Sequence, residues 1–344
     1  MNLKELATLL GLSPTTVSRA LNGYPEVNEE TRARVAAAAQ AHNYQPNARA
    51  IRLATGRAMA IGHVIPITNR HDIDNPIFGD FIAGAGVVYS RAGYDMLLSV
   101  VPDSEETQTY HNLKRRGAVD GVIVHAPRLN DARIRILHEI GLPYAVHGRA
   151  TGTELPYSWL DVNNRRAFRT ATAYLIGLGH RRIALVNGPD FMDFAIRRHT
   201  GYHEALEEVG LPTDPSLIHS DEMTESAGYR RAAQLLALPD PPTAILCASI
   251  LSGIGARRAV ETAGKVVGRD VSVMIYDDDL SYLRNGDGQP IFTAMRSSVR
   301  EAGSLMAEML LGLIANPDSP PVHRLLEADL VIGQTTGPGP AARS

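Results

Sequence analysis

Residues 13–22 read Ser-Pro-Thr-Thr-Val-Ser-Arg-Ala-Leu-Asn, and this pattern predicts a short helix with a polar outer face. Ser13 can cap the helix with its hydroxyl, and Pro14 then falls at the first helical position, where a missing N–H costs nothing. Val17 and Leu21 are four residues apart and are expected to face inward. The remaining outward-facing residues are Thr15, Thr16, Ser18, Arg19 and Asn22. Such a face suits hydrogen bonding to base edges and phosphates.

A helix on each side of this stretch predicts a compact all-α head. Apolar residues recur at helical spacing in 3–10, and Gly11 can end that helix because glycine readily adopts positive φ. Residues 28–43 predict a third helix that begins at an asparagine cap. Ala7, Gly11 and Val17 then stand where a helix-turn-helix needs a small crossing residue, a turn glycine and a buried branched residue.

The charge distribution separates this head from the rest of the chain. The first 60 residues carry seven basic and four acidic side chains, whereas the whole chain of 344 residues has a net charge of −3. A basic head on an acidic body fits a nucleic-acid contact confined to one end. The length predicts two or three domains, and 44% hydrophobic with 21% charged residues is typical of a globular protein.

The cellular context is indicated by what the sequence lacks. Cys247 is the single cysteine, which excludes an intrachain disulfide and favours a reducing compartment. No apolar run follows the N-terminal Met-Asn-Leu-Lys-Glu-Leu, and no stretch approaches the roughly 18 apolar residues of a membrane span. We therefore expect a cytoplasmic protein, associated with the nucleoid and without a membrane partner.

The segment 47–53, Asn-Ala-Arg-Ala-Ile-Arg-Leu, follows Pro46 and leads out of the head. It is too short to form a stable helix alone. One interpretation is a plain linker. The other is a hinge helix that forms only on DNA, with Leu53 inserted between base steps of the minor groove.

The head resembles that of the LacI/GalR family of bacterial transcription regulators. The resemblance rests on "TTVSRALNG" at 15–23, "NYQPN" at 43–47 and the "A-x-x-L" that ends at Leu53, and it extends more loosely to about residue 335. It implies that the second helix reads a major groove and that the hinge enters the minor groove of double-stranded operator DNA. The residues that match the family's DNA-contacting positions are Pro14, Thr15, Thr16, Ser18, Arg19, Asn22, Asn47, Arg49 and Leu53. Pro14 departs from the pattern because proline offers only apolar contact, so readout should rest on Thr15 and Arg19.

Residues 59–335 alternate between buried-strand runs and helical patterns. The predicted strands are 58–66, 94–101, 119–127, 143–148, 182–188, 243–249 and 271–279, and the predicted helices are 77–93, 104–117, 132–140, 166–180, 197–210, 227–238 and 252–264. This alternation predicts an α/β fold with parallel sheets covered by helices on both faces. Two similar series imply two lobes with a ligand cleft at the carboxyl ends of their strands.

The resemblance implies that these lobes form a periplasmic-binding-protein-like core behind the helix-turn-helix head. The expected segments are a head at 1–46, a hinge helix and linker at 47–58, a first lobe at 59–159 plus about 290–319, a second lobe at 160–289 plus about 320–335, and a flexible tail at 336–344. The chain should cross between lobes near 159–161, 289–291 and 318–320. The tail has no leucine heptads, so we expect a homodimer rather than a tetramer.

Three groups of residues are candidates for an effector pocket. Asn75 can cap the helix that follows it, and by resemblance its loop also lines the pocket, with Phe78 as a stacking surface. Arg198, in Arg-His-Thr-Gly-Tyr, matches the family's "R-x-x-G-[FY]" arginine that holds effector hydroxyls or a carboxylate. Asp277 matches a family aspartate that accepts hydrogen bonds from the effector. The carboxylates at 277–279 are adjacent and seldom converge on one ion, so we expect no metal site.

Other positions near the expected cleft complete the candidate set. Trp159 is either a sugar-stacking or a packing residue. Ser249 and Ile250 stand where the family often has Asn-Asp, so the pocket departs from better-known members. The complete set of candidate effector contacts is Asn75, Phe78, His147, Arg149, Trp159, Asp161, Arg198, Ser249 and Asp277.

The resemblance implies a homodimeric repressor of carbohydrate-utilisation genes, nearest to regulators of α-glucoside uptake. A small mono- or disaccharide effector is expected to release it from its operator. A co-repressor mode with a purine-like metabolite is the first alternative, and a solute-binding module without a regulatory role is the second. No G-x-S-x-G, H-E-x-x-H or phosphate-loop motif is present, so we expect neither an enzyme nor a cofactor.

Overall fold

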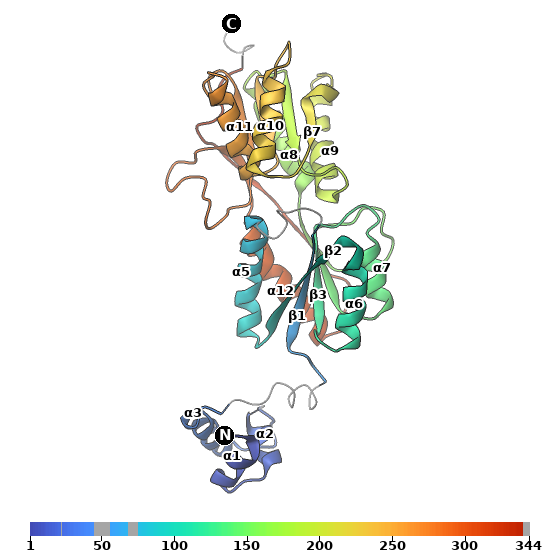
Figure 1. Ribbon diagram of the computed structural model, residues 1–344, viewed down its shortest axis with the longest axis vertical. Coiled ribbons are helices and arrows are strands. Elements are labelled where there is room, and N and C mark those ends of the chain that lie inside the picture. The colour runs from blue at the N-terminus through green and yellow to red at the C-terminus, as the bar shows by residue number, and fades with distance from the viewer. Residues whose placement is uncertain (22, 45–55, 68–74, 340–344) are drawn as a thin grey trace. The chain divides into compact units, whose positions relative to one another are not determined.

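The computed structural model describes residues 1–21, 23–44, 56–67 and 75–339 (Figure 1). The predicted DNA contacts Asn22, Asn47, Arg49 and Leu53 lie outside the described residues. The chain divides into two compact units, Met1–Met59 and Ala60–Ser344, which we describe separately as the head and the body.

The head consists of α1 (Leu3–Leu10), α2 (Pro14–Leu21) and α3 (Glu29–Ala41). Local capping explains where these helices begin. Asn2 and Glu5 form a reciprocal capping box on α1, and the Ser13 hydroxyl accepts a hydrogen bond of 3.0 Å from the Thr16 amide at the start of α2. Gly11 ends α1 with φ of 65°, a left-handed conformation that glycine adopts without steric cost.

Each helix of the head contributes a fully buried side chain to one small core. Leu6 from α1, Val17 from α2 and Val35 from α3 are all 0% exposed and belong to the same apolar cluster. The inward orientation predicted for Val17 is therefore confirmed. This core holds α1 and α2 together across the short turn that follows Gly11.

The first lobe of the body is a six-stranded parallel sheet with the order β11-β5-β4-β3-β1-β2. Its strands are β1 (Ala60–Ile67), β2 (Asp95–Pro102), β3 (Gly121–His125), β4 (Tyr144–His147), β5 (Trp159–Val162) and β11 (His323–Leu326). Its helices are α5 (Pro76–Arg91), η1 (Asp103–Glu105), α6 (Glu106–Arg115), α7 (Ala132–Glu139) and α12 (Val299–Ala315). Figure 1 shows α5 and α12 together on one side of this sheet and α6 and α7 on the other. The expected α/β arrangement is confirmed.

The second lobe repeats this plan with the strand order β12-β10-β9-β8-β6-β7. Its strands are β6 (Ile183–Asn187), β7 (Ile218–Ser220), β8 (Ala244–Cys247), β9 (Ser272–Asp277), β10 (Thr293–Arg296) and β12 (Asp329–Val331). Its helices are α8 (Asn164–Gly177), α9 (Asp193–Glu207), η2 (Pro215–Leu217), α10 (Glu225–Leu236) and α11 (Ile250–Thr262). The edge strand β12 is antiparallel to β10, so this sheet is not purely parallel.

The chain crosses between lobes at three places, after β5, after β10 and after β11. The last two crossings, near 296–299 and 326–329, come several residues later than the sequence suggested. The reason is strand pairing. The segment 293–296 first pairs with β9 of the second lobe, and 323–326 first pairs with β5 of the first lobe. Sequence pattern alone does not say which sheet a short strand joins.

Candidate functional site

The outer face of α2 is the candidate DNA surface of the head. Pro14, Thr15 and Arg19 are exposed, and Thr16 and Ser18 are partly exposed. The Thr16 hydroxyl lies 2.8 Å from the Ser13 hydroxyl, so it takes part in the cap at the start of α2. The polar side chains thus lie on the solvent side of a helix whose apolar side is buried, which is the arrangement that a recognition helix needs.

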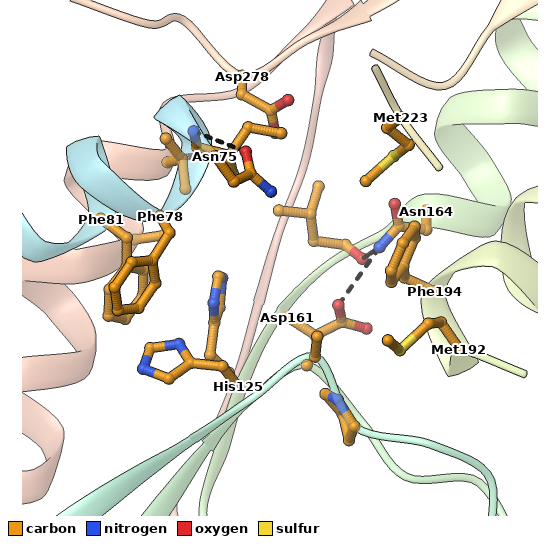
Figure 2. A pocket seen from close by; sticks show the side chains of 18 of the residues that line it. Asn75, Phe78, Phe81, His125, Asp161, Asn164, Met192, Phe194, Met223 and Asp278 are labelled. Atoms are coloured by element: carbon orange, nitrogen blue, oxygen red, sulfur yellow. Dashed lines mark hydrogen bonds between the residues drawn. The ribbon is translucent and has the colours of Figure 1, made fainter. Parts of the chain in front are cut away.

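The body contains a cavity of about 270 Å³ between its two lobes. Carboxyl ends of strands from both sheets contribute to it, with His125 from β3, His147 from β4 and Tyr276 from β9 among the lining residues. In parallel sheets these ends form the usual ligand crevice. Figure 2 shows Phe78, Phe81 and His125 on one side and Asn164, Phe194, Met192 and Met223 on the other.

Arg198 is a buried polar side chain of the cavity wall that several contacts hold in place. It projects from α9 and is 6% exposed. Its Nε donates a hydrogen bond of 2.7 Å to Asn164 Oδ1, and its Nη1 donates one of 2.8 Å to the Ala248 carbonyl. Its guanidinium carbon lies 4.2 Å from the ring centre of Tyr276 and 4.9 Å from that of Phe194. Stacking and hydrogen bonds therefore fix the fork in a single orientation.

Of the two neighbouring carboxylates Asp277 and Asp278, the one that lines the cavity is Asp278 rather than the predicted Asp277. Tyr276 and Asp278 face the cavity because side chains two residues apart share one side of an extended chain. Asp277 is 1% exposed, and its carboxylate accepts hydrogen bonds of 3.0 Å from Arg296 Nε and from the Asp279 amide. Burial raises the pKa of Asp278 to about 7, although the positive charge of Arg198 opposes this shift.

Arg149 and Asp161 form an ion pair in the cavity wall, with Arg149 Nε donating to Asp161 Oδ2 at 2.7 Å. Burial raises the pKa of Asp161, and the Arg149 contact opposes the change. Trp159 does not line the cavity. The Trp159 ring stacks on His323 with 4.9 Å between ring centres. The guanidinium carbon of Arg149, which lines the cavity, lies 5.1 Å from the centre of the Trp159 ring.

On the first lobe, Asn75 both caps α5 and lines the cavity. Its Oδ1 accepts a hydrogen bond of 3.1 Å from the Ile77 amide, and Phe78 follows on the first turn of the helix. His147 also lines the cavity, against the ring of Phe81 at 4.5 Å between ring centres. The loop at the start of α5 therefore serves both roles that the sequence left open, as a cap and as part of the wall.

Ser249 does not line the cavity and has a structural role. It is 0% exposed and caps α11, where its hydroxyl accepts a hydrogen bond of 3.1 Å from the Ser252 amide. The preceding residue, Ala248, lines the cavity instead. The bond between the Ala248 carbonyl and Arg198 contributes to the arginine's orientation.

Six of the nine candidate effector residues are therefore brought together, namely Asn75, Phe78, His147, Arg149, Asp161 and Arg198. Sequence reasoning missed several lining residues, including Phe81, His125, Asn164, Phe194, Tyr276 and Asp278. For Tyr276 and Asp278, alternation along the end of β9 was an available signal. Within the described residues, no three His, Cys, Asp or Glu side chains are placed to hold a metal ion, and no helix is long and apolar enough to cross a membrane.

A helix-turn-helix head joined to a two-lobed body with a ligand cleft defines a DNA-binding transcriptional regulator. Residues 2–47 match the family described as bacterial regulatory proteins, lacI family, and residues 172–336 match the periplasmic binding protein-like domain. HTH-type transcriptional regulator AglR of Rhizobium meliloti (strain 1021) is 45% identical over 340 residues, which cover 99% of this chain and 95% of that protein. The chain belongs to the LacI family, as its sequence motifs predicted.

Two solved structures support the same conclusion for the whole length of the chain. The structure described as the transcriptional regulator CelR–cellobiose complex is 30% identical with a TM-score of 0.72, and the match covers 97% of this chain and 99% of that one. The Lac repressor dimer bound to operator and the anti-inducer ONPF is 26% identical with a TM-score of 0.81, over 98% and 99% of the two chains. Both contain the head and the body.

Proposed function

We propose that this chain is a cytoplasmic, homodimeric repressor of carbohydrate-utilisation genes, released from its operator by a neutral mono- or disaccharide bound in the cleft. The observation that carries the proposal is the chemistry of the cavity. Arg198 supplies a charged hydrogen-bonding group and Asp278 an ionisable one, while Phe78 and Phe81 supply aromatic surface. A sugar has hydroxyl edges and apolar ring faces, and it matches such a wall better than an entirely apolar ligand does.

The relatives support a sugar as the effector class. The CelR structure is described as a complex with cellobiose. The relative with 45% identity, AglR, extends over almost the whole chain, and the sequence itself resembles regulators of α-glucoside uptake. We therefore propose α-linked glucosides as the first effectors to test.

On the head, we propose that Thr15 and Arg19 read base edges or phosphates, with Pro14, Thr16 and Ser18 in supporting contacts. Asn22 and the hinge residues Asn47, Arg49 and Leu53 are proposed from the sequence alone. In the body, the proposed effector contacts are Asn75, Phe78, His147, Asp161 and Arg198, with Asp278 in place of Asp277. Arg149 is proposed to orient Asp161 through their ion pair.

The effect of ligand on DNA binding follows from coupling between two sites. A ligand that favours one arrangement of the lobes shifts operator affinity by its differential binding, with a coupling free energy on the order of 1–3 kcal/mol. We propose that sugar binding disfavours the DNA-bound state. The coupling is reciprocal, so operator DNA should weaken sugar binding by the same factor.

The test combines calorimetry with an operator-binding assay. The full chain is titrated with maltose, trehalose, sucrose, cellobiose, ribose and hypoxanthine, and an operator is selected from a random duplex library. We expect an α-linked disaccharide to bind and to weaken operator binding. Hypoxanthine binding that strengthens operator affinity would support the co-repressor alternative. If the body binds sugar but the head has no affinity for any duplex, the result would support the solute-binding alternative.

A further inference from the structure

A chain of buried polar side chains lies behind the aromatic wall of the cavity. The Tyr89 hydroxyl on α5 is 3.3 Å from Nε2 of His63 on β1, and His63 Nδ1 is 3.0 Å from Nε2 of His125 on β3. Tyr89 is 1% exposed and His63 is 0% exposed, so both are shielded from solvent. His125 lines the cavity, so the chain ends where a ligand would bind.

The imidazoles of His63 and His125, the two histidines in this hydrogen-bonded series, are neutral at pH 7. Burial lowers the pKa of His63 to about 4. Burial also lowers the pKa of His125 well below its ordinary value, and nearby His63, His147 and Arg133 lower it further. A neutral imidazole has one N–H donor and one acceptor nitrogen, so each ring must choose between two tautomers.

The Tyr89 hydroxyl determines which way the hydrogen bonds of this series are donated. A buried hydroxyl needs an acceptor for its proton, and among the described residues the acceptor available to Tyr89 is His63 Nε2. His63 then carries its proton on Nδ1 and donates it to His125 Nε2. Because Nε2 of His125 accepts, the His125 proton lies on Nδ1. The reverse direction would leave the Tyr89 hydroxyl proton unsatisfied, at a cost of about 1–3 kcal/mol.

Aromatic neighbours fix the position of the His125 ring, which leaves the tautomer as its main variable. The rings of Phe81 and Phe78 meet it edge-on, with ring centres at 4.9 Å and 5.2 Å. Arg133 holds the backbone by donating a hydrogen bond of 3.0 Å to the His125 carbonyl. Figure 2 shows His125 beside Phe78 and Phe81 on one side of the cavity. Its Nδ1 has no hydrogen-bond partner among the described residues.

We propose that Tyr89 and His63 are positioning residues that hold His125 as the Nδ1–H tautomer, so that His125 offers the effector a hydrogen-bond donor and not an acceptor. The inference rests on the proposed function of the cleft as the effector site. It makes His125 a specificity-determining residue that selects a ligand oxygen, such as a hydroxyl or an acetal oxygen. A ligand that places a donor or a C–H group there would leave one buried polar group unpaired and would bind less tightly.

The first test needs no ligand and uses ¹⁵N NMR of the full chain labelled at histidine. We expect His125, assigned by the signals lost in His125→Asn, to show a protonated Nδ1 and an unprotonated Nε2. In Tyr89→Phe, where His63 loses its donor, we expect a mixture of the two tautomers. Tyr144→Phe is the control, because the Tyr144 hydroxyl is buried in the same sheet without a hydrogen-bond partner in the described residues. A His125 protonated on Nε2, or a tautomer unchanged in Tyr89→Phe, would overturn the proposal.

The second test asks whether the tautomer matters for recognition. Maltose, trehalose and sucrose are titrated into wild type, Tyr89→Phe, His125→Asn and the double variant. Asparagine can supply a donor near the position of Nδ1 without depending on Tyr89. For a sugar that binds, we expect Tyr89→Phe to weaken binding ~2–5-fold when His125 is present, because the sugar must then select the Nδ1–H tautomer from a mixture. In the His125→Asn background we expect the same substitution to have no measurable effect on sugar affinity.

Equal losses in the two backgrounds would show that the Tyr89 hydroxyl acts through the general structure, and would overturn the specificity role. If none of the three sugars binds, the proposed effector class is wrong, while the NMR result still decides the tautomer. Thermal unfolding of each variant confirms that the body remains folded.

Discussion

The Thr151 amide donates a hydrogen bond of 2.7 Å to Asp193 Oδ2, and this bond joins the two lobes of the body. Thr151 follows β4 in the first lobe, whereas Asp193 begins α9 in the second. Arg197, one turn along α9, pairs with Asp193 and also donates a bond of 2.7 Å to the Thr151 hydroxyl. Asp193 is 1% exposed and follows Met192, which lines the cavity. These contacts link the relative position of the lobes to the wall of the cleft.

Asp193→Asn should therefore weaken effector binding. Asparagine keeps the size of the side chain but loses the charge that pairs with Arg197 and strengthens the bond from Thr151. Hydrogen bonds to charged groups contribute about 1.5–3 kcal/mol, so we expect affinity for the bound sugar to fall ~10-fold or more by calorimetry. Asp190→Asn removes an exposed carboxylate three residues earlier and serves as the control. Equal affinities for wild type and Asp193→Asn would show that this link does not contribute to binding.

Arg198→Lys should strongly reduce effector affinity, even though lysine retains the positive charge. Lysine has no planar fork, so it cannot bond both Asn164 Oδ1 and the Ala248 carbonyl while stacking on Tyr276. We expect a ~100-fold loss of sugar affinity, with operator binding in the absence of sugar unchanged. Arg165→Lys is the matched control, because Arg165 pairs with Glu204 on the exposed surface of the second lobe. Its effect on sugar affinity should be less than ~2-fold, as for other surface ion pairs. A similarly small effect of Arg198→Lys would remove Arg198 from the proposed contacts.

Asp278→Asn should stabilise the folded chain more at pH 8 than at pH 5. Burial raises the pKa of this carboxyl from 3.8 to about 7, so between those values the folded state binds more protons there than the unfolded state. The contribution of Asp278 to the free energy of unfolding therefore falls as the pH rises through this range. Asparagine is neutral at every pH and avoids this loss. We expect the difference in Tm between variant and wild type to increase from pH 5 to pH 8.

Differential scanning calorimetry in the absence of sugar measures this difference. Asp279→Asn, which removes the exposed neighbouring carboxylate, controls for the change in net charge. A Tm difference for Asp278→Asn that is constant, or that shrinks as the pH rises, would contradict the assignment of a raised pKa.

How far sequence reasoning reached depends on the range of each interaction. The limits of α2 follow from neighbouring residues, since Ser13 and Pro14 specify its start locally, and the motifs of the head at 15–23 and 43–47 identified the family. Which carboxylate of the Asp277–Asp278 pair faces the cleft depends on the strand's orientation in its sheet, so family spacing alone selected the wrong neighbour for the cavity wall.

Contacts between strands that are far apart in the sequence could not be predicted from it. His63 and His125 are 62 residues apart and meet only because β1 and β3 are neighbours in the first sheet. Neither residue stands in a motif, and a lone histidine in an apolar strand gives no signal of a partner. The late crossings after β10 and β11 have the same origin, because strand order is a property of the assembled sheet rather than of the segment.

Gly84→Ala should destabilise the body, whereas Gly79→Ala in the same helix should not. At Gly84, α5 packs so closely on α12 that an added Cβ would overlap the Arg300 carbonyl oxygen, and backbone must shift to relieve the clash. Overpacking of this kind costs about 1–3 kcal/mol, which corresponds to a fall in Tm of roughly 2–10 °C for a domain of this size. At Gly79 nothing lies within 4 Å of an added Cβ, and alanine favours helix by up to about 1 kcal/mol over glycine. Calorimetry of the two variants should therefore give a lower Tm for Gly84→Ala and an equal or higher Tm for Gly79→Ala. Equal Tm values for the two variants would mean that α5 and α12 do not pack through Gly84.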